Sequence, residues 1–320
     1  MNEIKNQGPM LSMSAPPFWH CGRTLRRNSL LIILALLPAA VSAAWHWGIP
    51  AVRVMALSSV SAVLAEMLCQ KLMQRNVSPE DGTAAVTGLV FAMLLPAAAP
   101  WWMVVLGACI AIALGKMVFG GHGANPVSAV LVGWALLSVS FPDLMDPNSM
   151  LLSTDYADPL FRLKYYGAKS VEGFSYADLL LGNQIGALGA SQSGALLIGG
   201  FFLAATGVIH WEIAVSFLLG IILSAGALDI LLPGEYASPF FHVFTGSSVL
   251  CAFWLATESS CSPDRPAAMI LYGLAGGILT IIIRVFGMYS DGAPFAVMLI
   301  NLLTPYFNLI APKPFGHVRK

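Results

Sequence analysis

The first polar group in this sequence that could do chemistry is Asp81-Gly82-Thr83, with Thr87 one helical turn further on. Asp81 stands just before an apolar run, where its carboxylate can cap the amide groups at the start of a helix. The small residues beside it leave room for a ligand to approach the backbone closely. A capped helix packed against its neighbours explains the same residues equally well, so both interpretations stay open.

A glycine-rich stretch, Gly-Gly-His-Gly-Ala-Asn-Pro, occupies 120–126 and includes Asn125. Glycine readily adopts backbone conformations that other residues avoid, and successive amide groups in such a loop can face an anion. A phosphate-binding loop is therefore one interpretation. A plain turn between two helices is the other, and glycine-rich turns are common there.

Polar residues also gather in His-Val-Phe-Thr-Gly-Ser-Ser at 242–248, and Glu258 closes the same apolar segment. Thr245 and Ser247, together with the histidine and the acid, could form hydrogen bonds to a planar polar ring. Serine and threonine inside membrane helices also commonly bond to a carbonyl of the preceding turn. That second explanation is strong, so the cluster alone does not establish a site.

Arg284 and Asp291 form the fourth group. An unpaired charge is costly inside a membrane, which makes such residues candidates for function, although both side chains could equally reach the interface. Other chemistry is not indicated: the sequence has no phosphate-binding P-loop, nucleophile elbow or paired catalytic carboxylates. Its five cysteines form no Cys-x-x-Cys pair and its six histidines have no metal-binding spacing, which argues against a metal site.

The elements that must position these groups follow from the composition. Of 320 residues, 57% are apolar and 10% are charged, and the mean hydropathy is +0.76. Because soluble domains carry about a quarter charged residues, we predict an all-α integral membrane protein embedded in a lipid bilayer. The 16 basic residues balance the 16 acidic ones, which gives no sign of a nucleic-acid partner.

A membrane-spanning helix needs about 20 mostly apolar residues, and about ten apolar segments can be recognised. They are 29–47, 51–72, 84–96, 101–118, 126–141, 193–209, 212–232, 239–257, 267–285 and 294–311. With a cytoplasmic N-terminus, most basic residues fall on the cytoplasmic side, as the positive-inside rule requires. The sequence therefore predicts a multi-pass protein with both termini in the cytoplasm.

The polar connection 142–177 divides these segments into two five-helix halves, 29–141 and 178–312. An odd number of helices in each half gives the halves opposite orientations, which is the arrangement of an inverted repeat. In this scheme 142–177 is an extracytoplasmic loop, 1–28 is a cytoplasmic N-terminal segment and 313–320 is a cytoplasmic tail.

The third segment of each half, 84–96 and 239–257, is short or rich in small and polar residues. Interrupted segments at corresponding positions often line a cavity near the middle of the membrane, because unwound backbone must find hydrogen-bond partners there. We therefore expect a ligand or cofactor site between them.

Several phrases resemble the D subunit of the Rnf complex, which couples electron transfer between ferredoxin and NAD to ion movement. A related protein is the B subunit of the sodium-translocating NADH:quinone oxidoreductase. The matching short sequence motifs occur in the family's order through nearly the whole chain, at 81–89, 95–96, 99–102, 120–126, 180–183, 284–296, 301–305 and 315–317. The resemblance implies ten membrane helices in two related halves, which agrees with the segments above.

The resemblance also implies a flavin. The family's D subunit carries FMN, linked through its phosphate to a threonine that is followed by Pro-Leu in the central loop. Here Asp158 precedes Pro159-Leu160, and a carboxylate cannot form that phosphoester. We therefore expect noncovalent flavin, FMN or riboflavin, rather than covalent FMN. The residues expected to border the flavin or an ion path are Asp81, Thr87, Asn125, Asp158, Thr245, Ser247 and Arg284.

By resemblance, the protein is expected in the bacterial inner membrane, with other membrane and peripheral Rnf subunits as partners. Arg284 would balance the negative charge of a reduced flavin. The alternative is a transporter or channel with a similar five-plus-five arrangement, in which the small-residue segments line a pore. The motifs shared with the family at 81–82, 120–126 and 182–183 favour an Rnf-type subunit over a transporter or channel, because a simple channel has no evident need for them.

Overall fold

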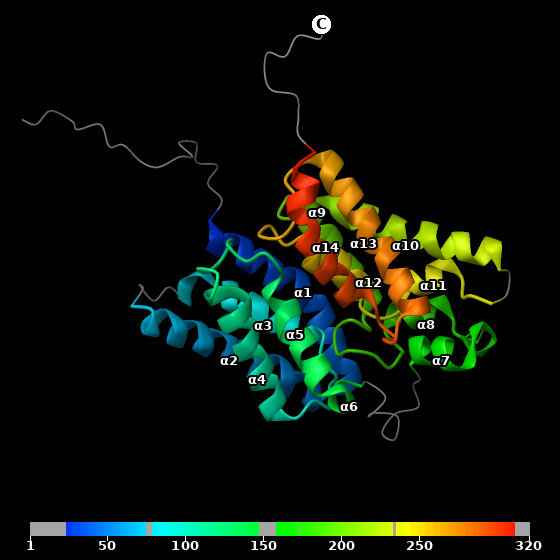
Figure 1. The fold of residues 1–320 in the computed structure, drawn as a ribbon. Helices are drawn as coiled ribbons and strands as arrows, with labels where there is room; N and C mark the ends of the chain where they lie inside the picture. Colours follow the sequence, from blue (N-terminus) through cyan, green and yellow to red (C-terminus); the bar gives the residue numbers. More distant parts are fainter. Residues whose placement is uncertain (1–23, 75–78, 147–157, 172, 233–234, 311–320) are drawn as a thin grey trace, which may run out of the picture.

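The computed structural model describes residues 24–74, 79–146, 158–171, 173–232 and 235–310, and the regular elements in these ranges are all helical (Figure 1). The helices are α1 (Leu25–Trp47), α2 (Ile49–Leu72), α3 (Thr83–Met93), α4 (Trp101–Ile112), α5 (Ala129–Ser140), α6 (Pro142–Met145), α7 (Pro159–Tyr166), α8 (Tyr176–Leu181), α9 (Ser193–Thr206), α10 (Trp211–Leu231), α11 (Pro239–Phe244), α12 (Ser248–Leu250), α13 (Pro266–Phe286) and α14 (Ala293–Asn308). Two π-helical turns, Ala113–Met117 and Cys251–Leu255, continue α4 and α12.

Nine of the ten predicted segments coincide with one helix or with a helix and its continuation, and the segment 239–257 contains two helices, α11 and α12, with a break between them. In the described residues, α1, α2, α10 and α13 are long and apolar enough to cross a membrane, while the remaining apolar helices are shorter or interrupted. The protein is therefore an all-helical membrane protein, as its composition predicts. The boundaries of the two halves stay a prediction, and 1–23 and 313–320 lie outside the described residues.

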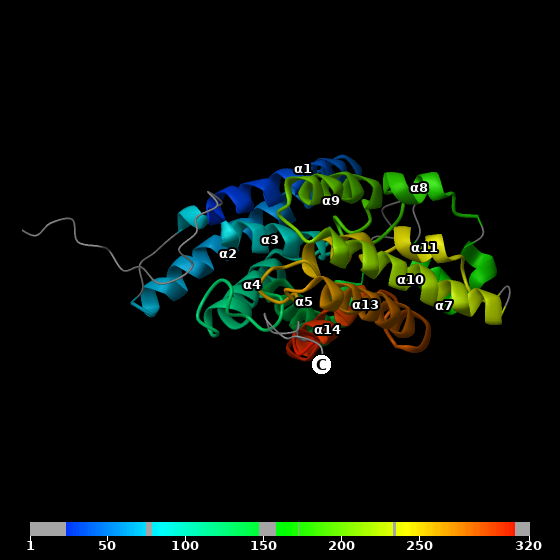
Figure 2. The ribbon, with the colours of Figure 1, turned by 90° about the horizontal axis from the view of Figure 1, so that it is seen from above.

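The first and second parts of the chain pack in the same way. α2 contacts α3 and α4, and α4 contacts α5; correspondingly, α10 contacts α11 and α13, and α13 contacts α14. Between the two groups, α1 and α9 lie side by side (Figure 2). An inverted repeat would produce this correspondence, although the opposite orientation of the halves in the membrane stays a prediction.

The α10–α13 contact is close because glycines remove side chains from it. A Cβ atom on Gly277 of α13 would collide with the carbonyl of Phe217 on α10, and one on Gly273 would collide with Ser216. Small residues allow membrane helices to approach closely, where packing contacts and not a hydrophobic force hold them together. These two helices thus form the tightly packed frame of the second half.

Both third segments are interrupted, as predicted. In the first half α3 ends at Met93, and 94–100 are largely irregular before α4 begins. The carbonyls at this end accept hydrogen bonds from the second half: Leu188 N donates to Leu95 O (2.8 Å) and Gly189 N to Met93 O (3.0 Å). In the second half α11 ends at Phe244, and the short helix α12 begins only at Ser248.

The predicted helix cap at Asp81 is wrong. Asp81 ends a short 3-10 turn, Pro79–Asp81, and Gly82 is the residue that caps α3, with a left-handed backbone (φ 68°) and no side-chain hydrogen bond. The left-handed glycine, and not the aspartate, therefore makes the turn into α3. Glycine suits this position because a positive φ has no steric cost for it.

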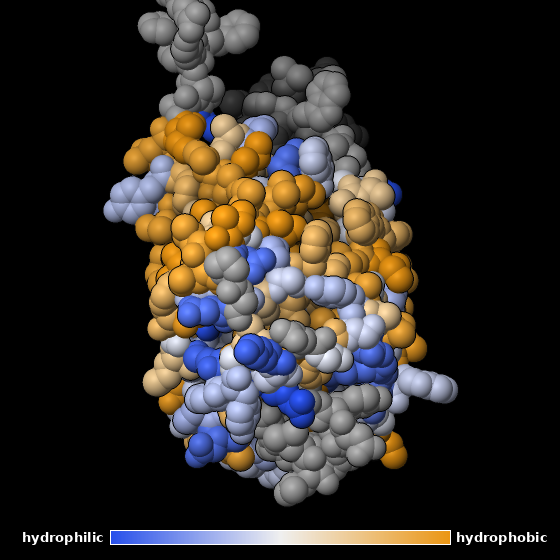
Figure 3. Space-filling view, turned by 90° about the vertical axis from the view of Figure 1, so that its right-hand side faces the viewer, coloured by the Kyte–Doolittle hydropathy of each residue, from blue (hydrophilic) through white to orange (hydrophobic). Residues whose placement is uncertain are grey.

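The surface separates apolar and polar regions. Along α1, exposed Leu30, Leu34, Leu37 and Val41 repeat at helical spacing on one face, which suits contact with lipid chains. Figure 3 looks at the side of the molecule where α7, α8 and α11 lie. Polar residues gather in its lower half, and hydrophobic surface covers the upper half. Polar surface of this kind is expected where a membrane protein extends into water.

Candidate functional site

Two cavities lie toward opposite ends of α3, and we call them inner and outer after the predicted topology with a cytoplasmic N-terminus. The inner cavity includes Thr83, Thr87 and Val90 of α3, whereas the outer cavity includes Leu94, the residue that follows the helix. Val90 and Leu94 are four residues apart, or about 6 Å along a helix axis. A wall of little more than one helical turn therefore separates the two cavities along α3.

Both π-helical turns contribute to the inner cavity: Lys116 comes from the first, and Phe253 and Trp254 come from the second. A π-helical turn inserts an extra residue into a helix and occurs often at functional sites. Residues of α1, α5 and α9 and of the adjoining loops complete the lining. The inner cavity is thus formed jointly by both halves of the chain.

A buried ion pair stands beside the inner cavity. Lys116 Nζ lies 2.7 Å from Glu66 Oε1 and donates a 2.8 Å hydrogen bond to Thr83 Oγ1. The exposed fractions of Lys116 and Glu66 are 3% and 8%. Such a pair inside a membrane helix bundle marks a candidate functional site. This pair was not predicted from the sequence, although a lone Glu and a lone Lys inside the predicted segments 51–72 and 101–118 were the available signal.

Asn125 ties the glycine-rich loop to the second half. Its amide donates to Val127 O (3.0 Å) and Glu258 Oε1 (3.3 Å), and both Asn125 and Glu258 line the inner cavity. Gly120, Gly121 and Gly123 have positive φ, as predicted for this loop. His122 lines the same cavity, where burial and the nearby Lys116 lower the pKa of its imidazole.

Trp254 offers the inner cavity an unused donor. Its side chain is 7% exposed, and its indole Nε1 has no hydrogen-bond partner among the described residues. By contrast, the Thr87 hydroxyl already donates to Thr83 O one turn earlier (3.0 Å), which is the alternative predicted for membrane helices. A buried N–H without a partner is costly, which makes Trp254 a candidate contact for a ligand.

The outer cavity, of about 350 Å³, is lined by carboxylates. They are Asp143, Asp146, Asp158 and Asp291. Asp158 caps α7: its Oδ1 accepts hydrogen bonds from Leu160 N (2.9 Å) and Phe161 N (3.2 Å). Burial raises the pKa of Asp158 to about 6, and the nearby charges of Asp291 and Asp146 add to the effect.

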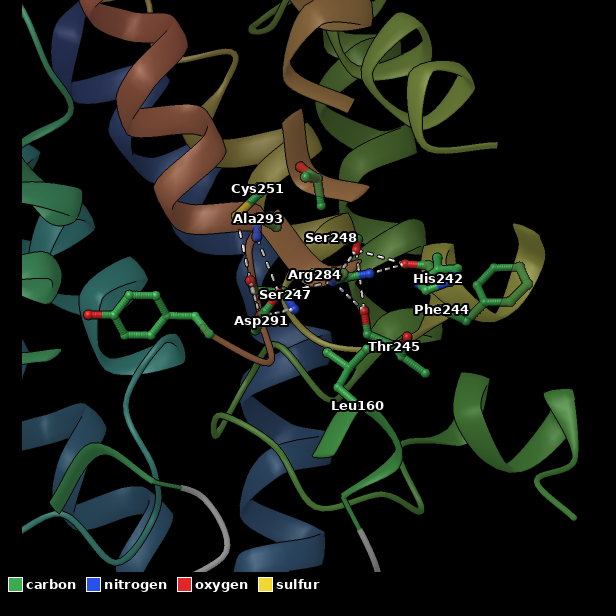
Figure 4. A network of polar contacts seen from close by, with 12 residues as sticks. Leu160, His242, Phe244, Thr245, Ser247, Ser248, Cys251, Arg284, Asp291 and Ala293 are labelled. Atoms are coloured by element: carbon green, nitrogen blue, oxygen red, sulfur yellow. Dashed lines mark hydrogen bonds and ion pairs between the residues drawn. The ribbon is translucent and has the colours of Figure 1, made fainter. Parts of the chain in front are cut away.

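Arg284 holds together the break between α11 and α12 (Figure 4). Its guanidinium donates to four acceptors: His242 O (2.6 Å), Thr245 O (3.1 Å), Ser248 Oγ (2.7 Å) and Asp291 Oδ1 (2.9 Å). Asp291 in turn accepts from Ser247 N (2.8 Å) and from the Ser247 hydroxyl. The carbonyls freed by the break are thereby satisfied, which gives Arg284 a structural role.

A second group from the α8–α9 region supports the same break. Gln184 Nε2 donates to Phe244 O (3.2 Å), and Ser193 Oγ donates to the same carbonyl (2.7 Å). Neither residue was predicted from the sequence, because their partner lies more than 50 residues away and no local pattern marks them. The Thr245 hydroxyl donates to Phe241 O (2.7 Å) within its own helix.

The seven predicted site residues do not form one site. Thr87 and Asn125 line the inner cavity, and Asp158 and Ser247 line the outer cavity. The other three line neither cavity: Asp81 lies before the start of α3, and Thr245 and Arg284 belong to the hydrogen-bond network around Asp291, which lines the outer cavity.

Comparison with known proteins agrees with this architecture. A family model described as the NQR2, RnfD, RnfE family matches residues 12–316. The chain is 34% identical over 310 residues to the D subunit of the Na⁺-translocating ferredoxin:NAD⁺ oxidoreductase complex of Acetobacterium woodii, covering 95% of this chain and 93% of that protein. It is 32% identical over 348 residues to the D subunit of the ion-translocating oxidoreductase complex of Yersinia enterocolitica, covering 97% and 99%. The chain therefore belongs to the NQR2, RnfD, RnfE family.

Proposed function

We propose that this protein is the D-type membrane subunit of an Rnf-type complex, which couples electron transfer between ferredoxin and NAD to ion translocation across the bacterial inner membrane. The observation that carries the proposal is similarity to two such subunits over at least 93% of their length and of this chain. The other membrane and peripheral subunits of the complex would be its partners. Both termini would lie in the cytoplasm.

The inner cavity is the better candidate for a noncovalent flavin. The Trp254 N–H, which has no partner among the described residues, and the Glu258 carboxylate are a donor and an acceptor of the kind that the edge of a flavin ring requires. At about 150 Å³ the cavity is smaller than most ligand pockets, so binding would require side chains at its mouth to move. A bound flavin supplies one- and two-electron transfer; the residues of this chain would bind and orient it.

The outer cavity does not fit the phosphate of a covalently attached FMN. Asp158 occupies the position at which the family's modified threonine is expected, and among the described residues the other charged side chains that line the cavity are acidic as well. A phosphate dianion would meet repulsion from these carboxylates. Thr154, the nearest threonine in the sequence, lies outside the described residues. Covalent FMN is therefore not part of the proposal.

Purification of the complex tests the proposal. An affinity tag on this chain, expressed from its own chromosomal locus, should recover the other Rnf-type subunits after mild detergent extraction, and mass spectrometry identifies them. An unrelated membrane protein carrying the same tag provides the control. Recovery of this chain alone, under conditions in which a tag on a second Rnf-type subunit retrieves an assembly without it, would contradict the proposal.

Flavin content tests the inner cavity. Trp254→Phe removes the indole N–H and keeps an aromatic ring, and it should lower the ratio of released flavin to protein in the purified subunit. Trp134→Phe is the matched control, because Trp134 lines the outer cavity and packs on Phe295. Equal flavin loss in both variants, or none in either, would place the flavin elsewhere.

The second candidate function is a transporter or channel. The observation that favours it is that the linings of the two cavities, at opposite ends of α3, come within about one helical turn of each other. The purified chain reconstituted alone in liposomes distinguishes the two functions. Passive ion or solute flux without any redox partner would support the transporter. A tight bilayer is the result expected for a subunit whose ion movement depends on electron transfer in the complete complex.

A further inference from the structure

The inner cavity contains a buried positive charge. Among the described residues, Lys116 is the only lysine or arginine in its lining, and its exposed fraction is 3%. His122 also lines the cavity, but burial and the nearby ammonium group lower the pKa of its imidazole, so it is neutral at pH 8. Glu258 is the carboxylate of the lining and is only partly buried, where water screens its charge. The deep charge of the lining is therefore positive.

The Glu66–Lys116 pair turns its positive end toward the inner cavity. Lys116 lines this cavity, whereas Glu66 does not. The carboxylate accepts hydrogen bonds from Lys116 Nζ (2.7 Å) and from Gln70 Nε2 of its own helix (3.3 Å). An ammonium group has three N–H donors, and Glu66 and Thr83 occupy two of them. One donor of Lys116 remains for a ligand.

Close packing fixes the position of the ammonium group. Lys116 belongs to the π-helical turn that continues α4, and Gly115 directly before it packs on α5. A Cβ atom on Gly115 would lie 2.6 Å from the Cα atom of Ala129, so this turn cannot approach α5 any further. The positive charge is thus held in place before a ligand arrives, which is what electrostatic tuning of a cofactor requires.

Arg284, in contrast, has its charge engaged elsewhere. It lines neither cavity, and its guanidinium pairs with Asp291 and bonds to the acceptors around the helix break (Figure 4). We infer that Lys116, and not Arg284, supplies the positive charge that stabilises the reduced form of a flavin in the inner cavity. The Glu66–Lys116 pair then sets the reduction potential of the bound flavin. This inference rests on the proposed function, in which the inner cavity binds a noncovalent flavin.

The physical reason is a difference in charge between the two redox forms. At pH 8 the ring of a reduced flavin is negatively charged, whereas the oxidised ring is neutral. A nearby cation in a poorly hydrated cavity therefore stabilises the reduced form much more than the oxidised form. Protein groups around a cofactor tune its electronic properties in this way, so the pair should raise the potential.

The reduction potential of riboflavin bound to the full-length chain in lipid nanodiscs tests the inference, measured without oxygen at pH 8 against reference dyes. The double variant Glu66→Gln with Lys116→Met leaves no unpaired buried charge, so it should remain folded. Its preference for reduced over oxidised riboflavin should fall about tenfold, which lowers a two-electron potential by about 30 mV. Lys116→Met alone leaves the carboxylate and should lower the potential further.

Two further variants separate charge from structure. Lys116→Arg keeps the positive charge and should restore most of the native potential. Lys71→Met is the matched control, because it removes an exposed lysine of α2 that lies outside the cavity lining. Its bound riboflavin should have the native potential.

A purely structural role for the pair predicts a different result. The double variant would then bind both redox forms equally more weakly, or lose both, and that outcome would overturn the inference. A native chain that does not bind riboflavin would overturn it as well. Neither result bears on recovery of the partner subunits with a tagged chain, so membership of an Rnf-type complex and the role of Lys116 fail separately.

Discussion

At the residue scale, Asp158 links the protonation of one carboxyl to the stability of the whole chain. Its pKa is about 6 in the folded protein, against an ordinary value of 3.8. Between these values the folded state binds more protons than the unfolded state, so stability falls as the pH rises through that window. Above pH 6 the buried, ionised carboxylate lowers the free energy of unfolding by its full amount, on the order of 3 kcal/mol.

Asp158→Asn should therefore raise the unfolding temperature at pH 8, because it removes the buried charge and keeps the cap. Near pH 4, where the carboxyl is largely protonated in the folded state and about half protonated in the unfolded state, the gap between native and variant should nearly close. Thermal unfolding followed by intrinsic fluorescence across this range provides the measurement. An equal difference in unfolding temperature between native chain and variant at both pH values would contradict ionisation of Asp158 as the cause.

The Glu66–Lys116 pair supports a second prediction. Lys116→Met leaves the Glu66 carboxylate buried without its partner, which should cost about 3–5 kcal/mol. The double variant with Glu66→Gln removes both charges and should recover part of that loss. Lys71→Met, at an exposed lysine of α2, is the control. Thermal unfolding in one detergent compares the native chain, Lys116→Met, the double variant and Lys71→Met. A Lys116→Met variant as stable as Lys71→Met would contradict a stabilising role for the ion pair.

The residues of the site were only partly predictable from the sequence. Arg284 and Asp291 are seven residues apart, so their pairing was within reach of local analysis. Glu66 and Lys116 are 50 residues apart, and the packing of α2 against the π-helical end of α4 brings them together. Such a contact depends on tertiary structure, which composition and spacing do not encode.

At the element scale, the glycines of α13 determine how closely it packs on α10. Gly277→Ala places a Cβ against the Phe217 carbonyl and should destabilise the protein by about 1–3 kcal/mol. Gly226→Ala of α10 is the matched control, because the nearest atom to its Cβ would be Pro239 Cγ at an ordinary 3.6 Å. Alanine favours helices by up to about 1 kcal/mol over glycine, so Gly226→Ala should be neutral or stabilising. Equal effects of the two changes would contradict the close approach.

The helices were well predicted because long apolar runs separated by polar turns leave few alternatives in a membrane. Their ends were less predictable. An interruption of the segment 239–257 was expected from its small and polar residues, but its position after Phe244 was not, and its partners Gln184 and Arg284 come from distant parts of the chain. The cap of α3 was assigned to the wrong residue, because an aspartate before a helix resembles a cap even where a left-handed glycine makes the turn.

At the scale of the whole molecule, two similarly packed groups of helices meet at α1 and α9 and enclose two cavities. The sequence predicted the two halves from the count of segments and from the central polar connection. It could not predict two separate cavities, because their linings combine residues from both halves. The distribution of the seven predicted residues between these cavities is a property of the assembled fold.

The orientation of the whole molecule is a testable prediction. The excess of basic residues on one side predicts that both termini are cytoplasmic. A green fluorescent protein fused to the C-terminus should fluoresce, and alkaline phosphatase at the same position should be inactive. Phosphatase inserted after Gly167, next to α7, should be active. Active phosphatase at the C-terminus would reverse the assignment of the inner and outer cavities to the two sides of the membrane.

The central claim is that this chain takes part in electron transfer coupled to ion movement. Inverted membrane vesicles from cells lacking its gene should reduce NAD with reduced ferredoxin slowly and without ion uptake, whereas vesicles from complemented cells should do both. Simultaneous measurement of NADH absorbance and ²²Na⁺ or proton uptake tests this directly. Equal ferredoxin-dependent NAD reduction and equal ion uptake with and without the gene would contradict the account.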